Sequence, residues 1–314
     1  MFKQVLGVCV VLCIAVGTLS ARADDQQLAV TARKTLQSYD KAIITLAAVI
    51  KIEVKGGEGS GQNHEQKTQS LATIIDSSGL AVAPLAYLAP TIRRTIGGQT
   101  YEFECQVQEV KYRLTDGTEI PARLVLKDDD LDLAFLAPLK PFDKATEAKI
   151  AFIPLSEPTT QPEVLDSTIL IGRTGEDLNY IPTLNLGRIL SLVSTPRTCY
   201  LSSSGSLGTP VFNQQGKMLG MICRCVKAEG SDGSSAARSA LLSQLILPVA
   251  DVLKLVPQAK EEAKKAAEAE KKKPKKTAKK SAGAAKKPAK PEKKTTKPEK
   301  KPADGKKAAS GAVD

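Results

Sequence analysis

Histidine is nearly missing from this 314-residue chain, in which His64 is the only one. A structural zinc site needs about four cysteine or histidine ligands at recognisable spacing. The closest pair of such residues, Cys223 and Cys225, has no histidine near it in the sequence. The sequence therefore gives only weak support to a metal site, and we expect neither a metal nor another cofactor.

Long apolar runs are missing as well, apart from one near the start of the chain. Lys3 is followed by an apolar run of 12 residues, Val5 to Val16, and then by small residues at Ala21 and Ala23, which is the pattern of a secretory signal. Because the run is too short to span a bilayer comfortably, an uncleaved transmembrane anchor is the less favoured alternative. We expect residues 1–23 to be a signal peptide and the mature protein to be exported, either periplasmic or secreted, with no transmembrane span.

The last part of the chain has no aromatic residue and only one large apolar residue, Val313. Residues 257–314 contain 20 lysines and eight acidic residues, a local balance that accounts for the whole net charge of +11. Since such a segment cannot bury a core, we expect a Lys/Ala/Pro-rich disordered tail. Its texture is similar to that of linker-histone tails, which implies salt-dependent binding to a polyanion such as a polysaccharide, an anionic lipid or non-specific nucleic acid. A solubilising or tethering tail is the alternative.

Four cysteines remain after residue 23: Cys105, Cys199, Cys223 and Cys225. In an exported chain an even number of cysteines permits disulfides, and four cysteines allow three full pairings. Cys223 and Cys225 lie two apart on an expected strand, so they share a face and are poorly placed to bond each other. Cys199 lies before the glycine-containing loop, and the expected strand with Cys223 and Cys225 lies after that loop. We therefore expect Cys199 to lie near Cys223 or Cys225, and a disulfide among these three residues is a candidate.

Residues 24–256 are dominated by strand signals. After an expected helix over Gln26–Leu46, alternating segments such as "AVIKIEV" (Ala48–Val54) and "YEFECQVQEVKYRL" are separated by glycine and aspartate turns. His64 lies in a polar stretch, "KGGEGSGQNHEQKTQ", that we expect to be a loop. Many short strands at this spacing predict an all-β barrel or sandwich, and a short helix over Val249–Leu255 closes this part of the chain.

The order of several segments carries a family resemblance. The segments "ATIIDSSGLAVAPLAYL", "LTDGTEIPARLVLKDDDLDLAFL", "LGRILS" and "GSLGTPVFNQQGKMLGMI" follow one another as in the trypsin-like serine proteases of the HtrA/Deg type, and "LILPVADVLKLV" resembles that family's closing strand and helix. This resemblance implies two six-stranded antiparallel β-barrels with an active-site cleft between them. It also implies serine endopeptidase activity, whereas the peptide-binding module that often follows the barrels in that family has no counterpart here.

The loop that carries the nucleophile in that family keeps its glycines here but not its serine. The family reads Gly-Asn-Ser-Gly-Gly-Pro, and this chain reads "GSLGTP". Aligning Gly205, Gly208 and Pro210 places Leu207 at the serine position. The resemblance makes Gly205, Ser206 and Leu207 the oxyanion-loop equivalents, whose backbone N–H groups could still bind a small anion or a carbonyl. A collapsed cleft filled by Leu207 is the favoured alternative.

The resemblance also places Ala86, within "GLAVAPLAY", at the histidine position and Asp132, within "DLAFL", at the aspartate position. Serine attack needs a hydroxyl, a base that takes its proton, and a group that orients the base. Removal of one such group costs roughly 10⁶-fold in a comparable hydrolase, and further losses add little. Of the triad-equivalent positions Ala86, Asp132 and Leu207, only Asp132 has the expected side chain, so no catalytic set is intact.

The sequence therefore predicts an exported trypsin-like pseudoprotease that acts as a binding or scaffolding protein toward an unidentified protein or peptide partner. One alternative is an active HtrA/Deg-type endopeptidase whose motif is shifted by one position, to Ser206. That reading needs His64 as its base, although His64 lies 22 positions before Ala86. A second alternative is a polyanion-binding protein that acts through its basic tail.

Overall fold

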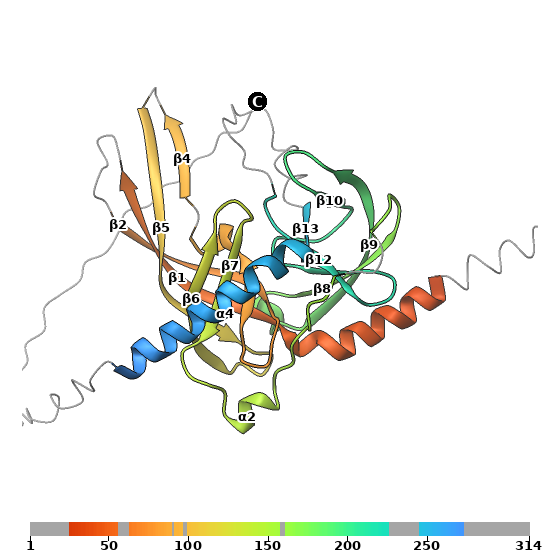
Figure 1. The fold of residues 1–314 in the computed structure, drawn as a ribbon, viewed down its shortest axis with the longest axis horizontal. Coiled ribbons are helices and arrows are strands. Elements are labelled where there is room, and N and C mark those ends of the chain that lie inside the picture. Colours follow the sequence, from red (N-terminus) through yellow and green to blue (C-terminus); the bar gives the residue numbers. More distant parts are fainter. Residues whose placement is uncertain are drawn as a thin grey trace, which may run out of the picture. The chain divides into compact units, whose positions relative to one another are not determined.

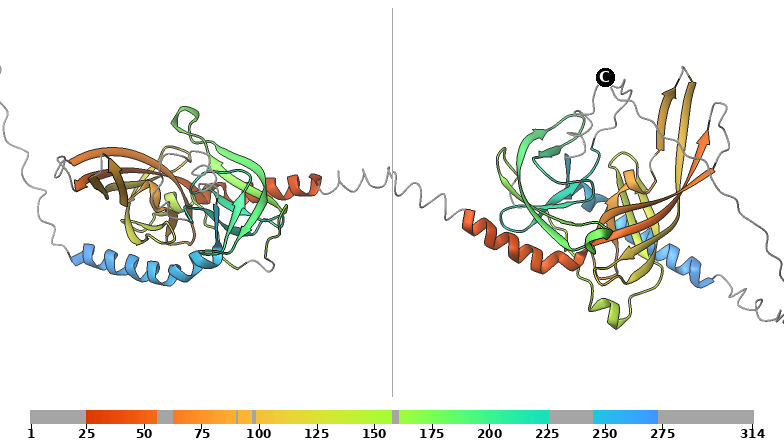
Figure 2. Two further views of the ribbon diagram at one scale, coloured as in Figure 1. Left: turned by 90° about the horizontal axis from the view of Figure 1, so that it is seen from above. Right: turned by 180° about the vertical axis from the view of Figure 1, so that it is seen from behind.

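The fold contains two antiparallel β-barrels that lie side by side (Figures 1 and 2). The computed structural model describes residues 25–55, 63–89, 91–96, 99–157, 161–225 and 245–272. The expected signal peptide and residues 273–314 lie outside the described residues. The architecture confirms the all-β, double six-stranded barrel that the sequence predicts.

The first barrel is closed because β5 pairs with both β6 and β1. Alternate residues of β1, including Ile44, Leu46 and Ala48, are buried in its core, as the two-residue period of a strand requires. An additional strand, β4 (Thr91–Ile96), pairs with the start of β5. The six barrel strands are, in spatial order, β1 (Ile43–Lys55), β2 (Asn63–Ile74), β3 (Ala81–Pro84), β7 (Leu133–Pro138), β6 (Glu119–Asp128) and β5 (Gln99–Arg113).

The second barrel begins after a short helix, α2 (Lys144–Glu147), in which the Asp143 carboxylate caps the Thr146 N–H at 2.7 Å. Its interior is a small apolar cluster that includes Leu170, Ile189 and Ile246. The strands are, in spatial order, β10 (Cys199–Ser202), β13 (Leu245–Pro248), β12 (Met218–Ile222), β11 (Pro210–Phe212), β8 (Ser167–Arg173) and β9 (Pro182–Val193).

The N-terminal helix is shorter than the sequence suggests. Residues 25–39 are helical, a 3₁₀ turn η1 (Asp40–Ala42) follows, and β1 starts at Ile43, so the expected helix over Gln26–Leu46 is wrong in its last part. The run Ile43-Ile44-Thr45 is β-branched, and such residues favour a strand over a helix. Tyr39, at the end of this helix, stacks on Phe212 with ring centroids 5.7 Å apart.

His64 does not lie in a loop. It is an exposed residue of β2 and pairs with Ile52 of β1. β2 meets β3 only at Thr73 and Ile74, so His64 lies on the order of 30 Å along the strand from the start of β3. The polar composition of this stretch reflects a solvent-facing strand end rather than a loop.

The closing helix α4 (Val249–Lys272) continues well beyond the expected Leu255 and through Pro257. It packs against β12 and β13 of the second barrel and against β6 and β7 of the first (Figure 1). Ala259 is fully buried, and the Lys260 ammonium lies 3.1 Å from the Asp76 carboxylate. Residues 257–272 of the expected disordered tail are therefore a helix that tertiary contacts hold. Within the part of the chain that the structure describes, no helix combines the length and the apolar character needed to cross a membrane.

Two side chains of the second barrel bind the first barrel. The half-buried guanidinium of Arg173 donates hydrogen bonds to the backbone carbonyls of Ile43 and Asp40, and its partial burial lowers its pKa. The Tyr180 hydroxyl accepts a hydrogen bond from Arg113, whose guanidinium lies 5.3 Å from the Tyr180 ring centroid. These contacts fix β8 and the loop after it against β1 and β5.

The length of α4 predicts how much of the C-terminal part can be deleted without lowering the melting temperature. Deleting residues 273–314 should leave the melting temperature nearly unchanged, because these residues follow the last helical contact. Deleting residues 257–314 should lower it by about 4–8 °C, because the loss of Ala259 packing and of the bonds from Arg123 to Ala266 and Glu270 removes about 2 kcal/mol. Thermal unfolding followed by circular dichroism compares the two forms, and equal melting temperatures would show that α4 beyond Val256 contributes nothing.

Candidate functional site

The loop at residues 202–209 keeps a fixed backbone shape through two glycines. Gly205 and Gly208 have φ values of 110° and 88°, in the region that favours glycine. A Cβ at Gly208 would lie 2.8 Å from the Leu71 carbonyl oxygen and 3.1 Å from Pro84 of the first barrel. A Cβ at Gly205 would lie 2.3 Å from Ile222. The glycines are therefore required by backbone conformation and by the close approach of the two barrels.

Leu207 is buried in the core of the second barrel. Only 7% of it is exposed, and the N–H of the next residue, Gly208, donates to the Ile222 carbonyl at 2.8 Å. Ala86, in the 3₁₀ turn η2 (Leu85–Tyr87) after β3, is partly buried and packs against the same cluster. The buried neighbours in that cluster are Leu170, Ile189, Tyr200, Val211, Ile222 and Ile246. The structure thus brings Ala86 and Leu207 to one apolar cluster that contains no nucleophile and no base at either position.

Asp132 links the two barrels through backbone groups. It precedes β7 with a φ of 56° and is 7% exposed. One carboxylate oxygen accepts the Ala86 N–H at 2.7 Å, and the other accepts the Arg224 N–H at 2.8 Å. The Asp132 carbonyl accepts the Leu85 N–H at 2.9 Å. Asp132 therefore holds the η2 turn of the first barrel and the segment after β12 of the second barrel at the same time.

The environment of Asp132 disfavours its charge. Burial raises the pKa of the Asp132 carboxyl from 3.8 to about 6, although the N–H groups of Arg224 and Ala86 oppose that shift. The Ala86 contact shows that Asp132 lies next to the position where the resemblance puts a histidine. Arg224 was not among the residues that the sequence pointed to, because a backbone N–H donor leaves no signal in residue type.

Comparison with known protein families connects this geometry with a known fold. Residues 17–221 match the model of the trypsin-like peptidase domain. The matched range includes Ala86, Asp132 and Leu207. The chain belongs to the trypsin-like peptidase family. It matches none of the curated proteins with which it was compared. The family and the double barrel agree with the coarser part of the sequence-based resemblance.

The serine beside Leu207 differs from Leu207 in its environment. Ser206 is exposed, and its hydroxyl lies 3.4 Å from the Thr209 hydroxyl. The Thr209 N–H donates to the Ser206 carbonyl at 3.0 Å and closes a tight turn. No described lysine or histidine is hydrogen-bonded to Ser206, and His64 lies far away along β2. In this arrangement of the trypsin-like domain, Ser206 has no partner that would take its proton.

Cys223 and Cys225 do not lie on a strand, contrary to the expectation from the sequence. β12 ends at Ile222, and the Cys225 N–H donates to the Cys223 carbonyl at 3.1 Å, so a tight turn replaces the strand. The four cysteines at 105, 199, 223 and 225 are free and buried. Cys199, Cys223 and Cys225 belong to one buried cluster, in which the Cys199 thiol acts to raise the pKa of Cys225. Cys105 lies in the other barrel, on β5.

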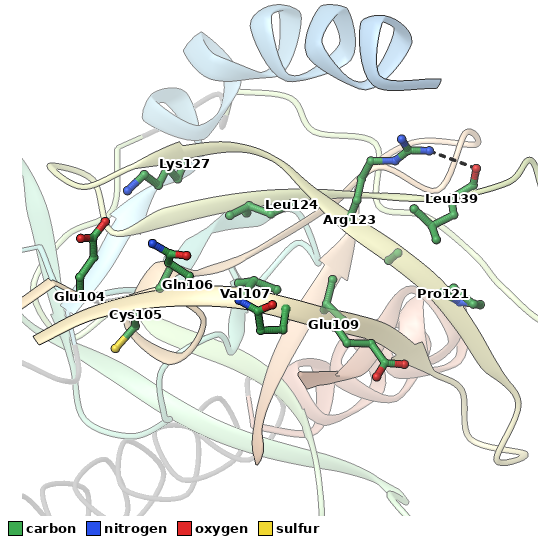
Figure 3. A pocket seen from close by; sticks show the side chains of 14 residues that line it. Glu104, Cys105, Gln106, Val107, Glu109, Pro121, Arg123, Leu124, Lys127 and Leu139 are labelled. Carbon is green, nitrogen blue, oxygen red and sulfur yellow. Dashed lines mark hydrogen bonds between the residues drawn. The ribbon is translucent and has the colours of Figure 1, made fainter. Parts of the chain in front are cut away.

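A cavity of about 630 Å³ lies apart from this junction, in the first barrel of the trypsin-like domain (Figure 3). It occupies the space where β5 and β6 diverge beyond their paired residues, Val110–Arg113 and Glu119–Ala122. Arg123 points from its wall toward α4 and donates to the Leu139 carbonyl at 3.2 Å. None of the candidate site residues at 86, 132, 205, 206 or 207 lines it.

The burial of Asp132 predicts a pH dependence of stability. Because its folded pKa of about 6 lies above the ordinary 3.8, its contribution to stability is fully present below about pH 4 and is lost as pH rises through 6, by up to about 3 kcal/mol. Asp132→Asn removes this loss. The free energy of unfolding of the variant minus that of the native protein should therefore increase by up to about 3 kcal/mol between about pH 4 and pH 7. Urea unfolding across this range measures the difference.

Asp76→Asn is the matched control for this measurement. Burial acts to raise the pKa of Asp76, but hydrogen bonds from Ser78 and Lys260 outweigh it and lower the pKa. The contribution of Asp76 is therefore present above its unfolded pKa and lost as pH falls, so its variant should show the opposite trend, at about pH 4 and below. A constant difference for Asp132→Asn over the whole range would contradict the buried carboxyl described above.

Proposed function

We propose that this trypsin-like domain is an exported pseudoprotease of HtrA/Deg-type ancestry that acts as a binding or scaffolding protein. The observation that supports it is the apolar cluster that buries Leu207 and contacts Ala86. Acyl transfer requires a hydroxyl and a base at one point, and an aliphatic pair supplies neither. Export rests on the sequence of residues 1–23, and the HtrA/Deg ancestry on the order of the strand motifs.

The same cluster favours binding over catalysis for a physical reason. A buried leucine contributes roughly 1.5–3 kcal/mol of apolar burial, so Leu207 stabilises the second barrel where a polar nucleophile would not. Asp132, at the position of the aspartate that orients the base in a peptidase, accepts one backbone N–H on each carboxylate oxygen. Each group at the junction therefore has a structural role that is independent of hydrolysis.

The proposal predicts no reaction with a reagent for activated serines. The purified protein should not be labelled by a fluorophosphonate and should not hydrolyse casein, because Leu207 has no hydroxyl and Ser206 has no base. Gel fluorescence after labelling, with an active trypsin-like protease as the positive control, measures this. Labelling of the native protein would support the alternative of an active endopeptidase, and mapping the labelled residue would test whether Ser206 is the nucleophile.

Restoring the missing groups gives a second arm of the same test. Leu207→Ser alone should give almost no activity, because an isolated serine hydroxyl is a weak nucleophile. Ala86→His with Leu207→Ser rebuilds a triad around Asp132, whose oxygens each keep a second lone pair for an imidazole. Recovered labelling should therefore require both substitutions, since such groups act as a unit. Equal labelling of the single serine variant would point to a base that has not been identified.

The tail supports a second candidate function, contact with polyanions. The concentration of 15 lysines in residues 273–314 is the observation that favours it. Binding to heparin should weaken by about 10³-fold or more between about 50 and 200 mM salt, and it should vanish when residues 273–314 are deleted. Retention on a heparin column measures both effects, and the deletion preserves α4. Unchanged retention of the shortened chain would assign any binding to the barrels instead of the tail.

A further inference from the structure

Three cysteines meet outside the interior of the second barrel, in the core that lies beneath α4 and the N-terminal helix. Cys199 begins β10, and Cys223 and Cys225 follow β12, on the other side of β13. Their exposed fractions are 1%, 0% and 2%, respectively. Because β13 lies between β10 and β12, a cysteine on β12 itself would be two strands away from β10. A cysteine in the turn after β12 can lie closer to β10.

The turn selects Cys225 as the neighbour of Cys199. The Cys225 N–H bonds back to the Cys223 carbonyl, and the Cys225 sulfur lies 3.9 Å from the carbonyl oxygen of Leu245 on β13. Leu245 in turn pairs with Leu201 of β10, two residues after Cys199, and both cysteines belong to the same buried cluster. The neighbouring Cys199 thiol, followed by burial, raises the pKa of Cys225. Cys223 is fully buried beside Asp132, and its pKa is raised by burial, then by the Asp132 charge and then by the charge of Cys199.

A metal centre does not explain this cluster. Among the described residues, no three histidine, cysteine or acidic side chains are grouped as metal ligands. Two thiols in mutual contact, with no metal group around them, are instead the arrangement from which a disulfide forms.

We propose that Cys199 and Cys225 form a disulfide bond when the protein folds in an oxidising environment, and that this bond fixes the turn whose Arg224 N–H holds Asp132. Arg224 lies between Cys223 and Cys225, so a covalent bond to β10 restrains its backbone directly. The bond also closes the chain segment that contains the loop at residues 202–209. This proposal does not depend on whether the protein hydrolyses peptides.

The chemistry is a two-step exchange with a small disulfide oxidant such as oxidised glutathione. One protein thiolate attacks a sulfur of the oxidant, which forms a mixed disulfide and releases one thiol. The second protein thiolate then attacks the protein sulfur of the mixed disulfide and releases the second thiol. The two cysteines lose two electrons and two protons, and the oxidant gains both. Because the folded protein buries both thiols and disfavours the Cys225 thiolate, the exchange should take place during folding and be slow afterwards.

Refolding with and without oxidant tests the proposal. The full chain is unfolded, reduced, and refolded in a buffer of reduced and oxidised glutathione or in reductant alone. We expect the oxidised product to lose the mass of two hydrogen atoms and proteolytic mapping to join the peptides of Cys199 and Cys225. Its melting temperature should be about 5–10 °C higher than that of the reduced form, because the bond restricts the unfolded chain. Amide hydrogen exchange in the peptide that contains Arg224 should be slower in the oxidised form.

Single serine variants identify the pair. Cys199→Ser and Cys225→Ser should abolish the mass loss, the rise in melting temperature and the added protection at Arg224. Cys223→Ser and Cys105→Ser are matched controls, and both should retain all three effects. Free thiols at all four of Cys105, Cys199, Cys223 and Cys225 after oxidative refolding of the native chain would overturn the proposal, as would a mass loss that persists in Cys225→Ser and disappears in Cys223→Ser. A bond without added protection at Arg224 would overturn its link to Asp132.

Discussion

The contact on which this structure depends is the pair of hydrogen bonds that the Asp132 carboxylate accepts. One comes from the backbone of Ala86 in the first barrel and the other from the backbone of Arg224 in the second. Burial of this carboxylate is unfavourable, as its raised pKa shows, and the two N–H donors offset only part of that cost. A charge kept under such conditions needs a function in the structure, and holding the segment after β12 against the first barrel, beside the apolar core that the two barrels share, is a sufficient one.

The same reasoning explains why the glycine loop is unchanged around a leucine. Gly208 lies so close to the Leu71 carbonyl and to Pro84 that any side chain would force the barrels apart, and Gly205 has a φ that other residues adopt at a cost. Neither requirement involves the side chain at position 207. A hydroxyl can therefore be exchanged for an aliphatic group there without changing the path of the loop, and the leucine then adds apolar contacts with Ala86 and its cluster.

Sequence reasoning succeeded where the signal lies in periodicity and failed where it depends on tertiary contacts. Alternating apolar residues and turn signals were enough to predict an all-β barrel or sandwich, and the family resemblance implied two six-stranded antiparallel barrels. The end of the first helix was misjudged because Ile43 and Ile44 fit either an apolar helix face or a buried strand, and pairing with β2 decides between them. The length of α4 was missed because its polar composition predicts disorder, whereas Arg123 and Asp76 hold its residues on the barrels. The role of Arg224 could not be predicted, since any residue except proline supplies the same N–H.

Several of the hydrogen bonds at the junction of the barrels use backbone groups. Asp132 binds two backbone N–H groups, Arg173 binds the backbone carbonyls of Asp40 and Ile43, and Gly208 lies against the carbonyl of Leu71. An interface of this kind is insensitive to the identity of the residues whose backbone it uses. The positions that correspond to a catalytic serine and histidine can therefore change while the junction keeps its geometry. The Arg224 N–H binds the turn after β12 to Asp132 of the first barrel, and a covalent bond from Cys225 to Cys199 would restrain the backbone at that point.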